Sequence, residues 1–540
     1  MQDESGAEDA QPSGVDTHAP GAVASSPRRF LRGLWASGRL SPRAHLVVGF
    51  VLPALALVAS MLSLRALTID DSYISYRYAQ NLASGLGLVY NAGERIEGYT
   101  NFLWTLLLAL GVRAHASPDV VAKLLGAFSA VGALGMTYLL SARLRPLGRA
   151  PVLSTWLFAT SSVLGGYAVF GLETLLFIFL VLAGAEVMLG EDDARAAYAD
   201  RREGPPRRGS HLPLSGLVFA LAGLTRPEAP LYIGIFMLFL GRRFLGRQNL
   251  LRGALFVLPL TAHLLWRHSY YGAWLPNTLS AKTGSLEQQV QGGLAYLNNY
   301  AIWCGPLLWL APAGLLFGLV ARRRVTLAVA TVAFAVLAYV VLVGGDWMPY
   351  FRFLAPFEPF CFLLICAAIR DVLERERASA TAGMLVVLAG ACVQRGAAME
   401  KARSAFAGED RFWKATSGAV VAWLTEHDVP GGVALGDIGY VGYATGYPVL
   451  DLLGLVDPVI SELPGGYTRK VGPGYTDRFF DKAPRYAVLI SGNDRCTKPT
   501  VPTSQVLYHD PRFSQRYGLA KPVVLKGGGA WCIFEQKSTK

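Results

Sequence analysis

Two adjacent carboxylates follow the first long apolar run of the chain. Residues 47–64 approach the length of a membrane-spanning helix, and Asp70 and Asp71 come shortly after them. Charge is costly to bury near hydrocarbon, so such residues usually line a wet cavity or pair with a functional cation. One carboxylate can act as general base for a hydroxyl group. The other can orient an acceptor molecule or help to hold a divalent cation such as Mg²⁺, Mn²⁺ or Ca²⁺ through its oxygens.

The division of roles between the two carboxylates stays open at the level of sequence. Asp70 is our first choice for the base and Asp71 the second, because adjacent residues on a helix or turn point in different directions. The structural alternative is that the pair caps a helix starting near Ser72 by accepting backbone N–H bonds. One aspartate would suffice for a cap, so we favour a functional site that includes both.

Further charged and polar residues are predicted at the ends of apolar runs, on the same side as the acidic pair. They are Arg77, Glu173, Arg226, Glu228, Asn277, Lys282, Asp346 and Arg352. The cations among them could stabilise an anionic leaving group. Lys282 and Asn277 share a polar loop that could bind phosphate or sugar oxygens, or could simply be solvated.

Several of these residues have structural alternatives within the set. Arg226 and Glu228 can satisfy one another as an ion pair, and Arg352 can pair with Asp346 or extend toward the membrane interface. Glu173 and Glu228 can instead complete a carboxylate cluster with the acidic pair. Sequence spacing does not choose between these arrangements.

Composition indicates the elements that must position these residues. The chain has 540 residues, of which 52% are hydrophobic and only 16% are charged. This balance lies far from that of soluble globular proteins and predicts a chain that uses lipid as its solvent. Apolar runs close to the length of a membrane-spanning helix recur along it. The sequence therefore predicts a polytopic α-helical membrane protein, with membrane lipids among its partners.

The net charge of +12 reflects topology and does not indicate a nucleic-acid partner. Arginines gather in alternate loops, around residues 28–43, 143–149, 195–208, 242–247, 322–324 and 370–377. The positive-inside rule places such loops in the cytoplasm. Counting crossings on this basis gives about eleven spans, with the N-terminus inside and the C-terminus outside. The apolar segment 101–114 could cross the membrane or lie along its interface.

Composition also divides the chain into segments. Residues 1–43 are predicted to be a disordered cytoplasmic tail with a basic end, followed by a retained signal-anchor. Residues 44–398 are predicted to form the membrane module, with a first external loop at about 67–104. Residues 399–540 are predicted to form an α/β domain outside the cytoplasm. It would contain a helix at 406–424 and strands at 432–435, 486–490, 523–525 and 530–534.

Cysteine usage points to one candidate cross-link. Cys304, Cys361, Cys366 and Cys392 fall in or near apolar spans, where a buried thiol is ordinary. Cys496 and Cys532 both fall in the predicted external domain, where a disulfide could form in an oxidising compartment or the thiols could stay free. Neither a Cys-x-x-Cys nor a His-x-x-x-His metal pattern occurs in the sequence.

Residues 70–104 also resemble a known family. They begin DDSYISYRYA and end GERIEGYTNFLW, and they are similar to the first external loop of GT-C glycosyltransferases. The closer resemblance is to the terminal β-(1→2)-arabinofuranosyltransferases. It continues through GLET at 171–174, LTRPE at 224–228, LPNT at 275–278, GGDWM at 344–348 with Arg352-Phe353, and DLLGL at 451–455.

This resemblance implies an activity. A polyprenyl-phosphate-linked sugar, with arabinofuranose as one candidate, would be the donor, and an envelope glycan or glycolipid would be the acceptor. The enzyme would lie in a bacterial inner membrane with its site on the outer side. Asp70 would take the acceptor proton in a single displacement that inverts the anomeric centre, by the logic of inverting glycoside chemistry.

Two other functional classes fit parts of the sequence. A transporter or flippase for lipid-linked sugars would also carry charges between spans, but it would favour internal repeats and charges at the membrane midplane. We find no such repeat and no Walker-type loop. A glycan-binding membrane protein, with residues 399–540 as its functional part, is the other alternative.

Overall fold

The structure of the protein is a computed structural model. It describes residues 42–144, 151–200, 212–240, 245–282, 284–320, 323–346, 348, 350–374, 378–427, 431–466 and 469–538. The chain divides into two units, Met1–His45 and Leu46–Lys540. Of the first unit only the start of helix α2 (Pro42–Leu46) is described, so the predicted tail lies almost wholly outside the described residues.

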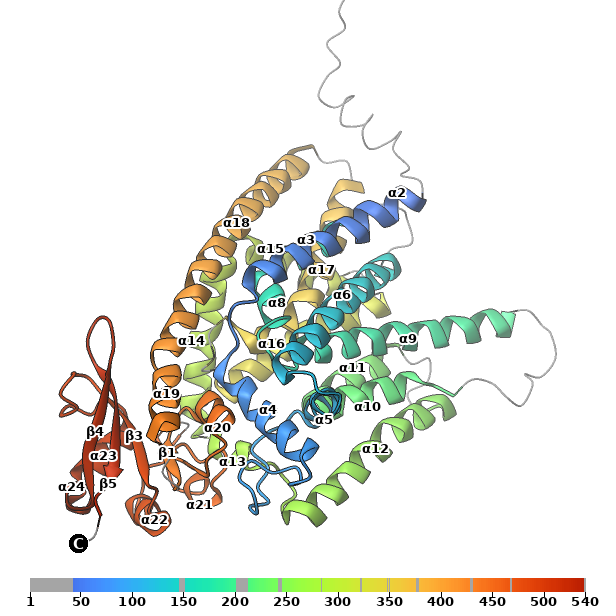
Figure 1. The fold of residues 1–540 in the computed structure, drawn as a ribbon. Helices are drawn as coiled ribbons and strands as arrows, with labels where there is room; N and C mark the ends of the chain where they lie inside the picture. The colour runs from blue at the N-terminus through green and yellow to red at the C-terminus, as the bar shows by residue number, and fades with distance from the viewer. Residues whose placement is uncertain are drawn as a thin grey trace, which may run out of the picture. The chain divides into compact units, whose positions relative to one another are not determined.

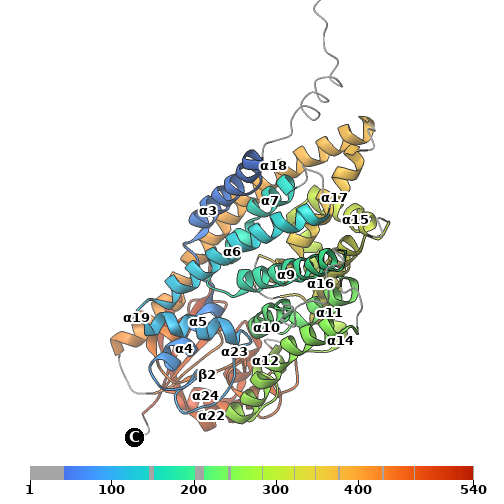
Figure 2. The ribbon, with the colours of Figure 1, turned by 90° about the vertical axis from the view of Figure 1, so that its right-hand side faces the viewer.

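Helices account for most of the described chain up to residue 415. They are η1 (Val47–Val51), α3 (Leu52–Leu64), α4 (Asp70–Ala83), α5 (Phe102–Arg113), α6 (Pro118–Leu144), α7 (Pro151–Ala159), α8 (Ser162–Tyr167), α9 (Thr174–Asp200), α10 (Ser215–Thr225), α11 (Ala229–Leu240), α12 (Arg247–Tyr271), α13 (Asn277–Lys282), α14 (Leu286–Cys304), α15 (Pro306–Val320), α16 (Arg324–Val343), η2 (Arg352–Leu354), α17 (Phe357–Glu374) and α18 (Ala378–Ala415). Figures 1 and 2 show them as a bundle of mostly long helices.

Five described helices are long and apolar enough to cross a membrane. They are Arg43–Leu64, Pro118–Leu144, Thr174–Arg195, Arg247–Tyr271 and Arg324–Val343. Shorter apolar helices, among them α5, α10 and α11, accompany them. Large apolar side chains also cover the outside of these helices, since Phe128 on α6 and Leu258 on α12 are 72% and 66% exposed. Such a surface suits lipid. The structure therefore fits a membrane protein, while the count of about eleven spans remains a prediction.

The segment 101–114 forms α5, which is a short apolar helix. A helix of this length extends about 18 Å, whereas the hydrocarbon core of a bilayer is about 30 Å thick. α5 therefore does not cross the bilayer by itself.

A five-stranded mixed sheet follows the helices. Its strands are β1 (Val433–Leu435), β2 (Val449–Asp451), β3 (Tyr486–Ser491), β4 (Tyr517–Val524) and β5 (Ala530–Gln536), in the order β2-β1-β3-β5-β4. β1 pairs in parallel with β2 and β3, and β5 pairs antiparallel with β3 and β4. Strands therefore form at each of the four predicted segments. β2 was not predicted, because its three residues lead directly into a turn.

Short helices complete the C-terminal region. They are α19 (Ser417–His427), α20 (Ile438–Thr445), α21 (Pro458–Ser461), α22 (Tyr475–Lys482), α23 (Pro502–His509) and α24 (Pro511–Arg516). α18 runs unbroken past residue 398 and leads through α19 to the sheet, as Figure 1 shows. The helix predicted at 406–424 is divided at Thr416, between α18 and α19.

A disulfide links Cys496, in the loop after β3, to Cys532 on β5, with a Cα–Cα distance of 5.9 Å. Of the two alternatives left open for these cysteines, the structure has the disulfide. Cys361 and Cys366 are buried as free thiols in α17, where they pack as small apolar side chains.

The C-terminal sheet packs on the segment that carries the acidic pair. Ile74 and Tyr78 on α4 share one buried apolar cluster with Leu435 on β1 and with Ile438 and Val441 on α20. α4 and α20 lie in direct contact. The sheet therefore helps to build the surroundings of the predicted site.

Candidate active site

Most of the predicted site residues lie at one set of helix ends. α9 begins directly after Glu173, α10 ends directly before Arg226, and α11 begins directly after Glu228. α16 ends shortly before Asp346, whereas its other end begins at Arg324, in a predicted cytoplasmic cluster. α16 therefore separates Asp346 from the arginine at its other end.

Asp70 caps a helix, but not the one predicted from the sequence. Its Oδ2 and Oδ1 accept hydrogen bonds from the backbone N–H groups of Gly439 (2.9 Å) and Tyr440 (2.8 Å), in the first turn of α20. Asp437, the residue at the N-cap position of α20, makes no capping bond through its side chain. Asp70 therefore satisfies N–H groups that a local cap would otherwise bind.

The Asp70 carboxyl is buried and close to other acidic groups. Burial, together with the charge of Asp437, raises the pKa of Asp70 to about 7, and the N–H donors only partly oppose this shift. Burial and then the charge of Asp71 raise the pKa of Asp437 to about 6. The three carboxyl groups therefore interact electrostatically, and Asp437 is a member of the site that was not predicted from the sequence.

Asp71 faces a different set of groups. Its Oδ2 lies 3.9 Å from Nζ of Lys282, on α13. Burial raises the pKa of Asp71, although the charges of Lys282 and Arg352 oppose the shift. Successive side chains on a helix point about 100° apart, which is why Asp70 meets α20 while Asp71 meets these cations.

Asn277 positions the helix that carries Lys282. Its side-chain amide donates to the carbonyls of Gly454 (2.7 Å) and Leu455 (3.0 Å), and its oxygen accepts from the hydroxyl of Ser461 (2.8 Å). The start of α13 is thereby fixed to the loop after β2. In this structure Asn277 contacts protein groups, which indicates a positioning role.

Arg226 lies between two buried carboxylates. Its Nη1 is 2.9 Å from Glu173 Oε1, and its Nη2 is 2.7 Å from Glu228 Oε1. Glu173 also accepts from the amide of Asn101 (2.9 Å), and Glu228 accepts from the hydroxyl of Tyr339 (3.0 Å). The Arg226–Glu228 ion pair considered for this set therefore forms, and Glu173 joins it through Arg226.

Arg352 forms an ion pair with Asp346, which was the structural alternative to a phosphate-binding role, with Nε 2.8 Å from Oδ2. The segment before it is held in an unusual backbone conformation, since Gly344, Gly345, Tyr350 and Phe351 all have φ between 59° and 88°. Left-handed residues other than glycine cost about 1–3 kcal/mol each and cluster at functional sites. This loop therefore fixes the buried guanidinium of Arg352 near Asp71 and Lys282. The positive charge of Arg352 acts to lower the pKa of both groups.

Arg77 makes a different set of contacts from the one expected for a phosphate ligand. Its guanidinium donates to the carbonyls of Tyr90 (2.7 Å), Gly442 (2.8 Å) and Tyr447 (2.7 Å). It is 4% exposed and lies over the ring of Tyr90. Arg77 therefore joins the first loop to α20 and the residues after it.

Solved structures with the same architecture are known. ArnT from Cupriavidus metallidurans in the apo state has a TM-score of 0.60 at 14% identity, covering 91% of this chain and 98% of that one. The same protein bound to undecaprenyl phosphate has a TM-score of 0.58 at 13% identity, over 89% and 97%. The chain has the ArnT fold. The oligosaccharyltransferase AglB from Archaeoglobus fulgidus, in complex with an inhibitory peptide and a dolichol-phosphate, matches with a TM-score of 0.51 at 15% identity, over 82% and 69%.

Sequence comparison confirms the predicted resemblance. Two relatives are named terminal beta-(1->2)-arabinofuranosyltransferase. That of Corynebacterium glutamicum is 29% identical over 53% of this chain and 47% of its own length, and that of Mycobacterium tuberculosis is 32% identical over 47% and 41%. The chain thus spans less than half the length of the curated relatives it matches. Residues 407–534, after most of the ArnT-like helices, match a family described as a domain of unknown function, DUF8728.

The acidic pair does not offer the ligand set of a metal site. Both oxygens of Asp70 accept backbone N–H bonds, and Asp71 faces the ammonium group of Lys282. Within the described ranges, no group of three or more His, Cys, Asp or Glu residues could hold a metal ion. The predicted ligands therefore do not fit a divalent cation in this arrangement.

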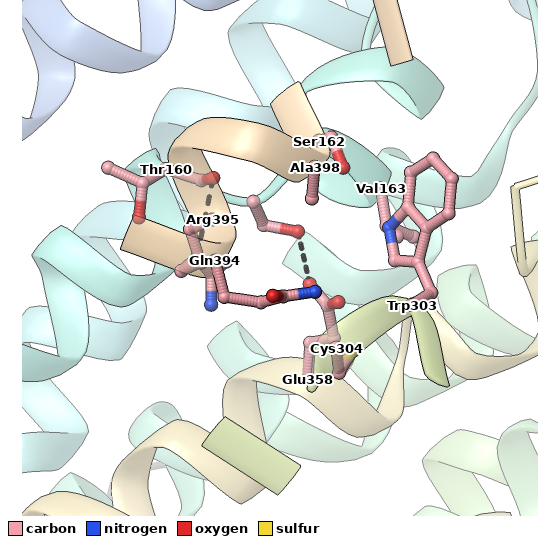
Figure 3. A pocket seen from close by; sticks show the side chains of 10 residues that line it. Thr160, Ser162, Val163, Trp303, Cys304, Glu358, Gln394, Arg395 and Ala398 are labelled. Atoms are coloured by element: carbon pink, nitrogen blue, oxygen red, sulfur yellow. Dashed lines mark hydrogen bonds between the residues drawn. The ribbon is translucent and has the colours of Figure 1, made fainter. Parts of the chain in front are cut away.

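A small cavity of about 20 Å³ lies elsewhere in the ArnT-like bundle, around Glu358 at the start of α17 (Figure 3). Ser161 and Tyr300 hydrogen-bond to Glu358, and Gln394 and Arg395 on α18 complete its polar lining. The volume suffices for a single water molecule. None of the residues predicted for the site lines this cavity.

Proposed function

We propose that the protein is a membrane glycosyltransferase that transfers a sugar from a polyprenyl-phosphate donor to a cell-envelope glycan or glycolipid. The observation that carries this proposal is the approach of Lys282 to Asp71. The charge of Arg352 also acts on the pKa of both groups. A carboxylate beside cations can remove a proton while the cations stabilise an anionic leaving group.

The comparisons support a lipid-linked donor. The ArnT structure contains undecaprenyl phosphate, and the AglB structure contains a dolichol-phosphate. The names of the two sequence relatives favour arabinofuranose as the transferred sugar, and the family resemblance implies an envelope glycan as the acceptor. We extend both features to this chain as part of the proposal.

In the proposed reaction, Asp71 takes the proton of an acceptor hydroxyl. The hydroxyl oxygen forms a bond to the anomeric carbon of the donor as the bond from that carbon to the phosphate oxygen breaks. The phosphate leaves as an anion beside Lys282 and Arg352, and attack from the opposite face inverts the anomeric centre. The triad of Glu173, Arg226 and Glu228 supports the surrounding helix ends.

We assign the base to Asp71 in preference to Asp70, our first choice from the sequence. Both oxygens of Asp70 already accept N–H bonds from α20, whereas Asp71 is directed toward the cations. Asp70 would then hold α20 and the sheet in place. No step of this mechanism passes through a metal ion.

We further propose a bacterial inner membrane with the site and the C-terminal α/β domain, residues 399–540, on its outer side. Two observations support this orientation. The disulfide between Cys496 and Cys532 suits an oxidising compartment. Described arginines lie at helix ends away from the site, with Arg143 near the end of α6 and Arg247 and Arg324 at the starts of α12 and α16, as the positive-inside rule requires for cytoplasmic ends.

Transfer by membranes that contain the full chain tests the proposal. A panel of polyprenyl-phosphate sugars, including arabinofuranose, is offered with an arabinan oligosaccharide, and Asp71→Asn, Asp70→Asn and Lys282→Gln are compared at matched expression. We expect Asp71→Asn to reduce kcat by at least 10³-fold, since general base and orientation are both lost. Asp510→Asn, a helix cap at α24, is the control. Full transfer by Asp71→Asn would contradict the assigned base, and binding of donor without any turnover by the wild type would favour a transporter.

A further inference from the structure

We propose that Asp437, contributed by the C-terminal region, binds hydroxyl groups of the sugar acceptor and orients the attacking one toward Asp71. This inference rests on the proposed function and names the part of the site that recognises the acceptor. Asp437 would then be a substrate-binding residue within residues 407–534, which match the domain family of unknown function.

The connection of Asp437 to its neighbours carries the first step. It follows β1 and directly precedes α20, where the N–H groups of Gly439 and Tyr440 bind Asp70. Because Asp70 adjoins Asp71, these bonds bring Asp437 to the acidic pair. The electrostatics agree with this placement. The charge of Asp437 raises the pKa of Asp70, and the charge of Asp71 raises the pKa of Asp437.

The Asp437 carboxylate is available for a ligand. An aspartate at an N-cap usually binds the N–H groups of its own helix, yet here Asp70 occupies them and Asp437 makes no capping bond. Its side chain is half-buried, in contrast to the buried Asp70. Among the residues that the structure describes, none is recorded as a hydrogen-bond or ion-pair partner of this carboxylate.

A second polar group, on the helix that carries Lys282, also lacks a partner among the described residues. The Thr278 hydroxyl, on α13, is without a hydrogen bond among the described residues, although the residue is only 9% exposed. Thr278 and Lys282 are four positions apart and share one face of α13, and Lys282 on that face approaches Asp71. A buried hydroxyl without a partner is costly, and a polar ligand at this point would satisfy it.

The chemistry of the groups indicates which ligand lies where. An ionised carboxylate only accepts hydrogen bonds, so adjacent Asp437 and Asp71 favour a molecule with several hydroxyl donors. An anionic phosphate would be repelled by Asp437 and fits the side of Lys282 and Arg352, whose positive charges offset that of Asp71. The acceptor is the polyhydroxylated, uncharged partner of the reaction, and it therefore fits the side of Asp437.

Aromatic rings on α20, the helix that begins directly after Asp437, suit the same ligand. Tyr440 on α20 lies edge-to-face with Tyr73 on α4, with 5.0 Å between ring centroids, and Tyr443 lies 5.5 Å from Tyr73. All three rings are partly exposed. Carboxylates beside accessible aromatic rings provide both hydrogen bonds and an apolar surface for a sugar ring.

Separate kinetics for the two substrates test the inference. Full-length wild type, Asp437→Asn and Asp437→Glu are assayed in membranes with polyprenyl-phosphate arabinofuranose and an arabinan oligosaccharide, each varied in turn. We expect Asp437→Asn to raise the acceptor KM by at least tenfold with the donor KM unchanged, and Asp437→Glu to recover part of the loss. Stabilisation by polyprenyl phosphate alone, measured as a thermal shift, should equal that of wild type.

The outcomes separate this inference from the proposed function. Equal increases in both KM values, or an acceptor KM like that of wild type, would overturn the role of Asp437 while leaving the enzyme in place. If the wild type transfers none of the sugars in the panel, the proposed function itself fails. A shift in the melting temperature of Asp437→Asn without a change in the KM ratio would show a structural role only.

Discussion

The carboxylate of Asp70 accepts the backbone N–H of Gly439, a residue 369 positions further along the chain. The same carboxylate accepts the N–H of Tyr440. These two bonds link the start of α4 to the start of α20. The protein therefore joins its first loop to its C-terminal sheet at the residue next to the proposed base.

Gly439→Ala should disrupt this junction. A Cβ atom at Gly439 would overlap both the main-chain carbonyl and the carboxylate of Asp70, so α20 would have to move. We expect transfer to fall more than tenfold and the C-terminal region to become sensitive to limited proteolysis. Gly418→Ala is the control, since its nearest neighbouring atom lies 3.7 Å away. Wild-type transfer and protease resistance in Gly439→Ala would show that the contact is dispensable.

Arg226→Gln should destabilise the protein strongly. The side chains of Arg226, Glu173 and Glu228 are only 10%, 5% and 8% exposed, so the substitution leaves two buried carboxylates without their cation. Removing one partner of a buried ion pair costs about 3–5 kcal/mol. Thermal unfolding in detergent measures the loss. The triple variant Glu173→Gln, Arg226→Gln, Glu228→Gln should be more stable than Arg226→Gln alone, and the opposite order would contradict this account.

The stability of the wild type should depend on pH through Asp451. This carboxyl is fully buried, and burial raises its pKa to about 7 although the N–H groups of Leu453 and Val456 oppose the shift. A raised pKa means that the folded state holds the proton more tightly than the unfolded state. The contribution is therefore complete below about pH 4 and is lost as the pH rises to 7.

Melting temperatures of wild type and Asp451→Asn between pH 4 and pH 8 measure this effect. The variant cannot titrate at this position. The melting temperature of the variant minus that of wild type should therefore increase as the pH rises through this range. A difference that stays constant with pH would show that the carboxyl titrates at its ordinary value.

Loss of the disulfide should weaken the C-terminal sheet. Cys496 and Cys532 are separated by 36 positions, and closing a loop of that size stabilises a fold by roughly 3–4 kcal/mol in the chain-entropy model. The double variant Cys496→Ser, Cys532→Ser, or wild type treated with a reductant, should therefore show faster proteolysis within the sheet. Cys304→Ser should keep the reductant response of wild type, because Cys304 is not in the disulfide.

The sequence allowed the helix ends of the site to be predicted because the signal there is local. Glu173, Arg226 and Glu228 directly adjoin apolar runs, so their place at the helix ends followed from the pattern of hydropathy. The strands of the C-terminal region were also evident as short apolar runs, whereas Cys496 and Cys532 were only a candidate pair whose disulfide the structure supplies.

The remaining features depend on contacts between distant parts of the chain. Arg77 resembles a phosphate ligand in sequence, but it donates to the carbonyl of Gly442, 365 positions away. Asp437 has no distinctive local pattern beyond the glycines on either side of its Asp-Ile pair, and its importance follows from the docking of α20 on Asp70. The direction of Asp70 and Asp71 likewise depends on which element packs against each side chain.

The junction between Asp70 and α20 also sets an order of events during biosynthesis. Gly439 is made 369 residues after Asp70, an interval of roughly 20–70 s at bacterial elongation rates of about 5–20 residues per second. Throughout that interval Asp70 and Asp71 have been synthesised, whereas α20, whose N–H groups bind Asp70, has not. A nascent chain that ends before α20 therefore lacks the N–H donors that Asp70 binds in the folded protein.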